Sequence, residues 1–170
     1  MSQRMSGYAR VPDDVYETPS WAVTCLIPHL PKHLRSIHDP AMGTGNITDT
    51  LIAETDLIVT GNDISNGVDF LKESMWHESI CMNPPYRQAE EFITHSLEVA
   101  DFVAALLRVD YDSAKTRRYL FGDCSRFAKK LILTRRIIWF ERPGAAPSYN
   151  HAWFCWSSAH RGPPTICYAP

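Results

Sequence analysis

The sequence predicts an α/β fold, in which a mainly parallel sheet is covered by helices and completed by a C-terminal antiparallel hairpin. Two observations support this prediction. Apolar strand-like runs alternate with helix-like segments through the first two thirds of the chain, and three more strand-like segments then follow without a long helix between them. With 170 residues, of which 45% are hydrophobic and 21% charged, we expect a single domain spanning residues 1–170 with a buried core.

The helices and strands of the first 121 residues are predicted from local patterns. Pro19 favours a helix start immediately after it, and Phe92, Ile93, Leu97 and Ala100 have the spacing of one helix face. We expect helices over residues 20–30, 47–54, 88–100 and 113–121. Strands are expected over residues 37–38, 57–61, 78–82 and 102–109, the last being a near-continuous apolar run typical of a buried strand.

The C-terminal third carries three strand-like segments, over residues 130–134, 137–140 and 151–156. A loop of glycine, alanine and prolines over residues 141–150 separates the last two segments. We therefore expect these two to pair as a terminal β-hairpin.

The most informative motif is Asn83-Pro84-Pro85-Tyr86, directly after a predicted strand. The asparagine supplies a side-chain oxygen that accepts a hydrogen bond, and the prolines stiffen the turn so that the Pro84 carbonyl faces the same donor. Tyr86 offers a surface on which a planar group can stack. Because open α/β sheets bind ligands at the carboxyl ends of their strands, the motif is suited to holding a flat amine. An ordinary Pro-Pro turn is the alternative.

A second motif lies upstream, at Asp39-Pro40-Ala41-Met42-Gly43-Thr44-Gly45. Its glycines allow a tight turn in which backbone N–H groups approach a ligand. The third glycine of the dinucleotide-binding fingerprint is missing, and a carboxylate stands at the strand end. The motif therefore suits an amino-bearing ligand better than a pyrophosphate.

With both motifs in this order, the chain resembles the S-adenosylmethionine-dependent amino-methyltransferases, in particular the bacterial and phage N6-adenine DNA methyltransferases. In that family a D-P-x-x-G-x-G loop holds the methionine end of the cofactor, and an N/D/S-P-P-Y/F/W motif holds the target amine. A Tyr/Phe-x-Thr-Pro element beside the cofactor is matched by Tyr16-Glu17-Thr18-Pro19. The resemblance implies a Rossmann-like S-adenosylmethionine-dependent methyltransferase fold.

The resemblance also implies the site residues. The catalytic residues are expected to be Asn83, Pro84, Pro85 and Tyr86. Asp63 is expected to accept hydrogen bonds from the cofactor ribose, Asp69 from its adenine amine, and Phe70 to cover the adenine ring unless it is plain core. The full set expected to bind S-adenosylmethionine is Tyr16, Thr18, Pro19, Asp39, Pro40, Ala41, Gly43, Gly45, Asp63, Asp69 and Phe70.

Charge is distributed unevenly along the chain. Residues 1–100 carry a formal charge of −8 and residues 101–170 a charge of +6. The positive part includes Lys115, Arg117, Arg118, Lys129 and Lys130, which we expect to contact the phosphates of duplex or single-stranded DNA. A solvated helix face would give a similar run.

Cysteine and histidine spacing indicates no disulfide framework and no metal site. The five cysteines form no C-x-x-C pair, and the only helical histidine spacing, His29 to His33, spans Pro31. No stretch approaches the roughly 18 apolar residues of a membrane span. We therefore expect reduced cysteines and a location in the cytoplasm of a bacterium or a phage-infected host.

The expected reaction is direct methyl transfer from S-adenosylmethionine to the exocyclic N6 amine of an adenine flipped out of DNA. Four alternatives remain open at this point: methylation of RNA adenine, of a protein glutamine or of the cytosine amine, and a non-catalytic module that binds cofactor or nucleic acid. The usual N-terminal helical domain of glutamine methyltransferases is missing, and the serine usual for cytosine enzymes is replaced by Asn83. Lacking a separate target-recognition domain, the chain is expected to have short or relaxed sequence specificity. Target sequence and oligomeric state stay open.

Overall fold

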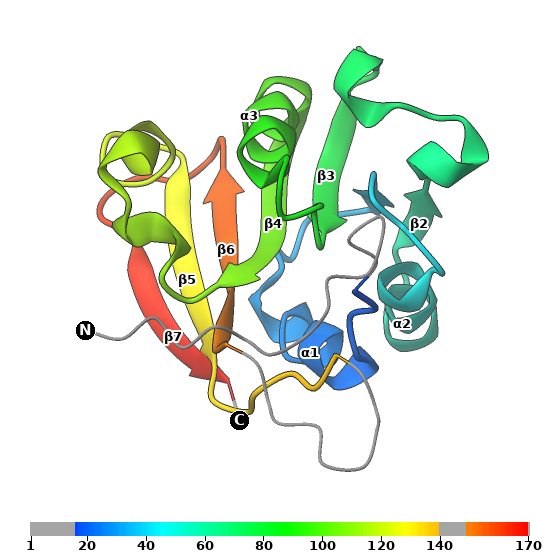
Figure 1. Cartoon of the computed structure of the whole chain (residues 1–170), viewed down its shortest axis with the longest axis horizontal. Coiled ribbons are helices and arrows are strands. Elements are labelled where there is room, and N and C mark those ends of the chain that lie inside the picture. The colour runs from blue at the N-terminus through cyan, green and yellow to red at the C-terminus, as the bar shows by residue number, and fades with distance from the viewer. Residues whose placement is uncertain (1–15, 140–148, 170) are drawn as a thin grey trace.

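A seven-stranded sheet forms the centre of the molecule in the order β2-β1-β3-β4-β6-β5-β7 (Figure 1). The computed structural model describes residues 16–139 and 149–169. The strands are β1 (Ser36–Asp39), β2 (Ile58–Gly61), β3 (His77–Met82), β4 (Ala100–Arg108), β5 (Phe127–Leu133), β6 (His151–Ser157) and β7 (Thr165–Ala169). Among these strands β6 alone runs antiparallel to its neighbours. The predicted α/β fold with a mainly parallel sheet is confirmed.

Helices cover both faces of this sheet. The α-helices are α1 (Ser20–Thr24), α2 (Asn46–Glu54) and α3 (Ala89–Val99). Short 3₁₀ helices complete the set: η2 (Ile27–His29), η3 (Ile64–Asn66), η4 (Phe70–Lys72), η5 (Tyr111–Ser113) and η6 (Lys115–Leu120). None of the helices in residues 16–139 and 149–169 is long and apolar enough to cross a membrane.

Successive residues of the central strands enter two separate cores, because side chains alternate between the two faces of a strand. One core lies under α1 and α2, and the other lies under α3. In β4 the first core receives Phe102, Ala104 and Leu106, and the second receives Val103, Ala105 and Leu107. Burial of both faces explains why this strand reads as a continuous apolar run.

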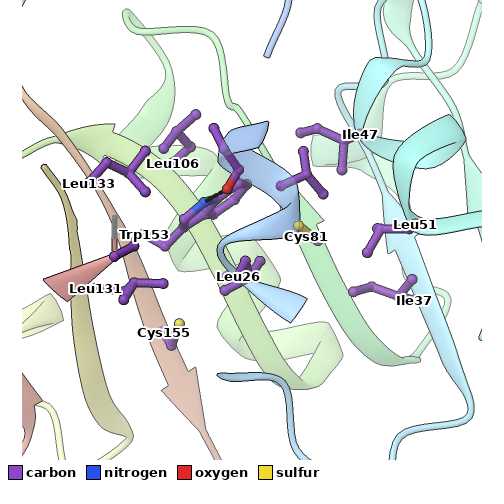
Figure 2. Packing of buried hydrophobic residues seen from close by; sticks show 14 of the residues in the cluster. Leu26, Ile37, Ile47, Leu51, Cys81, Leu106, Leu131, Leu133, Trp153 and Cys155 are labelled. Atoms are coloured by element: carbon purple, nitrogen blue, oxygen red, sulfur yellow. Dashed lines mark hydrogen bonds between the residues drawn. The ribbon is translucent and has the colours of Figure 1, made fainter. Parts of the chain in front are cut away.

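Two buried tryptophans of β6 connect the sheet to the elements on its two faces. The Trp153 indole nitrogen donates a hydrogen bond of 2.7 Å to the Ala22 carbonyl of α1. Figure 2 shows this side chain beside Leu26 and Leu106. On the other face, the Trp156 indole donates at 2.7 Å to the carbonyl of Leu120. The first bond fixes α1, and with it the segment that precedes α1, against the sheet.

Two predicted helices are wrong in extent or type. The helix expected over residues 20–30 ends at Thr24, and Ile27–His29 forms a separate 3₁₀ turn. Pro28 lacks the N–H that a continuing helix would need, which explains the break. The helix expected over residues 113–121 is replaced by η5 and η6, which are separated by the extended backbone of Ala114.

The C-terminal hairpin has a different first strand from the one predicted. Residues 137–139 form no strand, and Phe140 and residues 141–148 lie outside the described residues. Instead β5 pairs antiparallel with β6, and β7, which was not predicted, pairs parallel with β5. The Trp139 ring centroid lies 5.5 Å from that of Tyr16 and 5.1 Å from that of His151. Its side chain therefore packs between the N-terminal segment and β6 and is not part of a hairpin strand.

We predict that Trp153→Phe lowers the free energy of unfolding by about 2–4 kcal/mol. The change leaves a buried carbonyl without its donor, worth about 1–3 kcal/mol, and removes buried volume. Chemical denaturation measures the effect. Trp76→Phe is the matched control, because that side chain is 59% exposed and should change stability by less than about 0.5 kcal/mol. Equal effects of the two changes would contradict the prediction.

Candidate functional site

The candidate site lies at the carboxyl ends of β1 and β3. From β1 the chain crosses to β2 on one side, and from β3 it crosses to β4 on the other side. Connections that leave two adjacent parallel strands in opposite directions open a crevice between them. The two predicted motifs directly follow these strands, with Asp39 ending β1 and Asn83 coming after β3.

A cavity of about 470 Å³ occupies this position. It is lined by the N-terminal segment, the glycine loop, the loop after β2 and the loop after β3. The lining residues are Tyr16, Glu17, Thr18, Ala41, Met42, Gly43, Thr44, Asn46, Ile47, Asp63, Ile64, Ser65, Asn83 and Pro85. The three motifs identified in the sequence thus meet around one cavity.

The glycine loop is held between β1 and β2 by backbone hydrogen bonds. Met42 N–H donates to the Asn62 carbonyl at 3.0 Å, and Asn62 N–H donates to the Asp39 carbonyl at 3.0 Å. Gly45 has a φ of 98°, the left-handed region that favours glycine, and caps the start of α2. At Gly61 a Cβ atom would lie 2.8 Å from Met42 Sδ and 3.2 Å from the Asp39 carbonyl, so a side chain there would displace Met42 and crowd the end of β1. This role of Gly61 was not predicted from the sequence.

Asp39 presents a carboxyl group in need of a partner. The residue is 2% exposed, and its Oδ1 accepts a hydrogen bond of 3.0 Å from Ala41 N–H. Within the described part of the chain, its buried Oδ2 has no hydrogen-bond partner. Burial raises the pKa of Asp39 to about 7, against the opposing effect of the Ala41 hydrogen bond. A ligand amino group would supply the missing donor and a compensating charge.

Asp63 is held in the opposite electrostatic state. Its Oδ2 accepts from Gly43 N–H at 3.0 Å, and its Oδ1 accepts from Ser65 N–H at 2.9 Å. Although burial acts to raise the pKa of Asp63, the hydrogen bonds from Ser65 and Gly43 bring it below its usual value. The carboxylate is therefore ionised and lines the cavity, with lone pairs left for hydroxyl donors.

The Asn83 side chain is oriented by the N-terminal segment. Its Nδ2 donates a hydrogen bond of 2.8 Å to the Tyr16 carbonyl. Because a carbonyl can only accept, this bond fixes which way the amide points. The amide oxygen of Asn83 is then the atom available as an acceptor at the cavity.

An aromatic cluster, consisting of Tyr16, Tyr86, Trp139 and His151, adjoins Asn83. Tyr16 lies 5.3 Å from Tyr86 and 5.5 Å from Trp139 between ring centroids, and the Tyr86 hydroxyl lies 3.3 Å from His151 Nε2. Burial lowers the pKa of His151 to about 4, so its imidazole is neutral near pH 7. Tyr16 and Tyr86 were predicted to belong to the site, whereas Trp139 and His151 were not, because their segments were interpreted as a hairpin.

Asp69 and Phe70 lie away from the cavity lining. The Asp69 carboxylate pairs with Lys72 at 2.8 Å and caps η4 by accepting from Leu71 N–H. Phe70 is 2% exposed and packs 5.4 Å from Phe92, in the core under α3. Their proposed contacts with the cofactor adenine stay predictions. The other predicted residues outside the lining are Pro19, Asp39, Pro40, Gly45, Pro84 and Tyr86.

The predicted basic residues do not form one surface. Lys129 and Lys130 point to opposite faces of β5, where Lys129 reaches His29 at 3.4 Å and Lys130 pairs with Asp112 at 2.7 Å. On η6, Arg118 pairs with Asp123 at 2.9 Å, Arg117 stacks on Tyr111, and Lys115 is exposed. Contact of these five residues with nucleic acid stays a prediction.

Comparison with known proteins gives matches at the level of structure. No protein-family model matches the chain, and no curated protein does. A protein from Pyrococcus horikoshii, provisionally described as an RNA methyltransferase, superposes with a TM-score of 0.65 at 13% identity, over 85% of this chain and 87% of that one. A Listeria monocytogenes protein, provisionally described as a class I S-adenosylmethionine-dependent methyltransferase, gives 0.57 at 14% identity, over 88% and 62%.

A third match is the methyltransferase subunit of a type I restriction-modification system from Streptococcus thermophilus. Its TM-score is 0.55 at 12% identity, over 88% of this chain and 45% of that one. At such identities the likeness shows the fold and not the substrate. The chain therefore has the Rossmann-like α/β fold of S-adenosylmethionine-dependent methyltransferases.

Proposed function

We propose that the protein is an S-adenosylmethionine-dependent methyltransferase that methylates the exocyclic N6 amine of adenine in DNA. The observation that carries this proposal is the Asn83 amide, whose nitrogen is bonded to the Tyr16 carbonyl at the edge of the cavity. Its oxygen is thereby the acceptor offered to an amine. The Asn-Pro-Pro-Tyr motif and the shared fold support the same reaction.

The residues around the cavity fit the cofactor. The buried Asp39 Oδ2 lacks a donor, which the amino group of the methionine moiety would supply. The ionised Asp63 carboxylate is suited to accept from ribose hydroxyls. When bound, S-adenosylmethionine supplies a methyl group on a positively charged sulfur.

On the substrate side, the protein positions the amine and does not need a covalent intermediate. The Asn83 oxygen accepts from the amine, and the Tyr86 ring offers a face for the base, which must leave its stack to reach the site. Rate enhancement then comes from orientation and electrostatics. Cys81 is not suited to attack a ring carbon, because its side chain is fully buried and because burial raises the pKa of its thiol well above the usual value.

A nucleic acid is the substrate class favoured by the motif and by the descriptions of two matched structures, one an RNA methyltransferase and the other a restriction-modification subunit. DNA is preferred because the motif set resembles that of N6-adenine DNA methyltransferases. The substrate class is tested by offering labelled S-adenosylmethionine with unmethylated duplex DNA, single-stranded DNA, RNA and a protein mixture. We expect N6-methyladenine in the DNA nucleosides. Label confined to RNA or protein would replace DNA as the proposed substrate class. Absence of label in every substrate would contradict the assignment as a methyltransferase.

Asn83→Ala should lower turnover by about 10²–10³, because it removes an acceptor aimed at the reacting amine. Cofactor affinity should be unchanged, since Asn83 contacts the target side of the cavity. Single-turnover assays and calorimetric titration with the cofactor measure the two quantities. Asn83→Asp is the matched variant, because it keeps the acceptor but loses the donor to the Tyr16 carbonyl. Its turnover should lie between those of the wild type and Asn83→Ala. Normal turnover of Asn83→Ala would refute the catalytic assignment.

Asp39→Asn should weaken cofactor binding about 10–100-fold, because a hydrogen bond to a charged group is worth about 1.5–3 kcal/mol. The same change should stabilise the cofactor-free protein at pH 8. In wild type the folded state holds a proton on Asp39 up to about pH 7, whereas the carboxyl in the unfolded chain loses it near its ordinary pKa of 3.8. As pH rises from about 4 to about 7, the free energy of unfolding of the wild type should therefore decline relative to that of the variant, by up to about 1.4 kcal/mol per pH unit. Above about pH 7 the two stability curves should run parallel.

Denaturation of both proteins between pH 4 and 8, with and without cofactor, checks these expectations. Glu17→Gln is a control, because that residue lines the cavity but is exposed. Its stability should differ from that of the wild type by less than about 0.5 kcal/mol. Parallel stability curves for wild type and Asp39→Asn over the whole range would contradict the burial argument.

A further inference from the structure

A second group of polar side chains lies outside the cavity lining and is not used by the proposed reaction. It consists of His38 on β1, Glu73 after η4, and His77 at the start of β3. One ligand-type atom from each residue lies within 4.8 Å of the others. We call this group the histidine cluster.

The two histidines each hold a buried nitrogen that needs a partner. Both His38 Nε2 and His77 Nε2 are buried, and neither makes a well-formed hydrogen bond within the described residues, although the Asn62 side chain interacts with the His38 ring. Buried polar atoms in folded proteins are almost always bonded. Together with the adjacent Glu73 carboxylate, these two atoms form a set of potential metal ligands.

Neighbouring side chains already orient the cluster. Thr60 Oγ1 lies 2.8 Å from His38 Nδ1, so the other ring nitrogen is directed to the cluster. Asn62 Nδ2 lies 3.2 Å from each oxygen of the Glu73 carboxylate. Hydrogen bonds of this kind orient imidazole and carboxylate ligands at metal sites.

We propose that the histidine cluster binds one divalent transition-metal ion through two imidazole nitrogens and one carboxylate oxygen. Zn²⁺ matches this donor set, with a fourth position left for solvent. The inference is independent of the proposed methyl transfer. It was not accessible from sequence spacing, because His38 is distant in the chain and the Glu73-x-x-x-His77 spacing does not lie on a helix.

Binding requires a defined local adjustment. The two rings are stacked, with centroids 4.2 Å apart and planes 11° from parallel. A tetrahedral zinc ion with bonds of about 2.0–2.2 Å holds its ligand atoms about 3.4 Å apart and lies near the plane of each imidazole ring that binds it. One ring must therefore turn, and the ligand atoms, which lie within 4.8 Å of one another, must approach to that separation.

The ion would stabilise the backbone that holds the glycine loop beside the cavity. Asn62, whose side chain orients Glu73, also accepts from Met42 N–H and donates to the Asp39 carbonyl through its backbone. His38 is the residue before Asp39. An ion at the histidine cluster would thus restrain the ends of β1 and β2, to which the glycine loop is hydrogen-bonded.

The test uses the untagged full chain, equilibrated with one equivalent of Zn²⁺, dialysed and analysed for metal content. We expect one zinc per chain and a higher melting temperature than in the metal-free protein. Glu73→Gln and His77→Gln should each weaken zinc binding at least about tenfold. His33→Gln, which changes an exposed histidine outside the cluster, should bind like wild type.

Co²⁺ substitution separates this site from adventitious binding at cysteines. Nitrogen and oxygen ligation should give visible d–d bands without a thiolate-to-metal charge-transfer band. A thiolate band, less than one zinc per chain, or equal binding by wild type and both cluster variants would overturn the proposal. Circular dichroism of the metal-free variants establishes that they are folded. The variants are placed at Glu73 and His77 because these residues are only half-buried, whereas His38 is buried and its replacement would disturb the fold.

Discussion

The position of β1 between two parallel neighbours is the constraint on which the rest of the site depends. With β2 on one side and β3 on the other, the chain leaves β1 and β3 in opposite directions. The polar residues that end these strands, Asp39 and Asn83, are therefore brought to one edge although the sequence separates them by a whole βα unit. The glycine loop, the Asp63 carboxylate and the Asn-Pro-Pro-Tyr turn all derive their positions from this arrangement.

A second requirement is that the N-terminal segment stay at that edge. Two long-range hydrogen bonds achieve this, from Asn83 to the Tyr16 carbonyl and from Trp153 to the Ala22 carbonyl. Between them lies Thr18, which is buried and lines the cavity. The residue proposed to hold the target amine is thus itself positioned by backbone that lies 67 residues earlier in the chain.

Two acidic residues, Asp63 in the cavity lining and Asp39 at the start of the glycine loop, show how environment divides the roles of one functional group. Asp39 is buried with one unpaired oxygen, so its pKa rises to about 7, whereas Asp63 accepts two backbone hydrogen bonds and its pKa falls. The first is electrostatically incomplete without a cationic donor, and the second is complete and ionised. The amino group and the neutral ribose hydroxyls of the proposed cofactor match this division.

The sequence alone determined the α/β class, most strand positions and the three motifs that meet at the cavity, because alternation, apolar runs and turn residues act through local backbone preferences. It did not determine which side chains from distant segments become neighbours. Trp139 and His151 join Tyr16 and Tyr86, and the basic run is dispersed, with Lys129 and Lys130 on opposite faces of β5. The histidine cluster likewise assembles from three separate elements. Only the tertiary structure decided these contacts, since strand order, register and packing across the sheet are set by the whole core and not by any one segment.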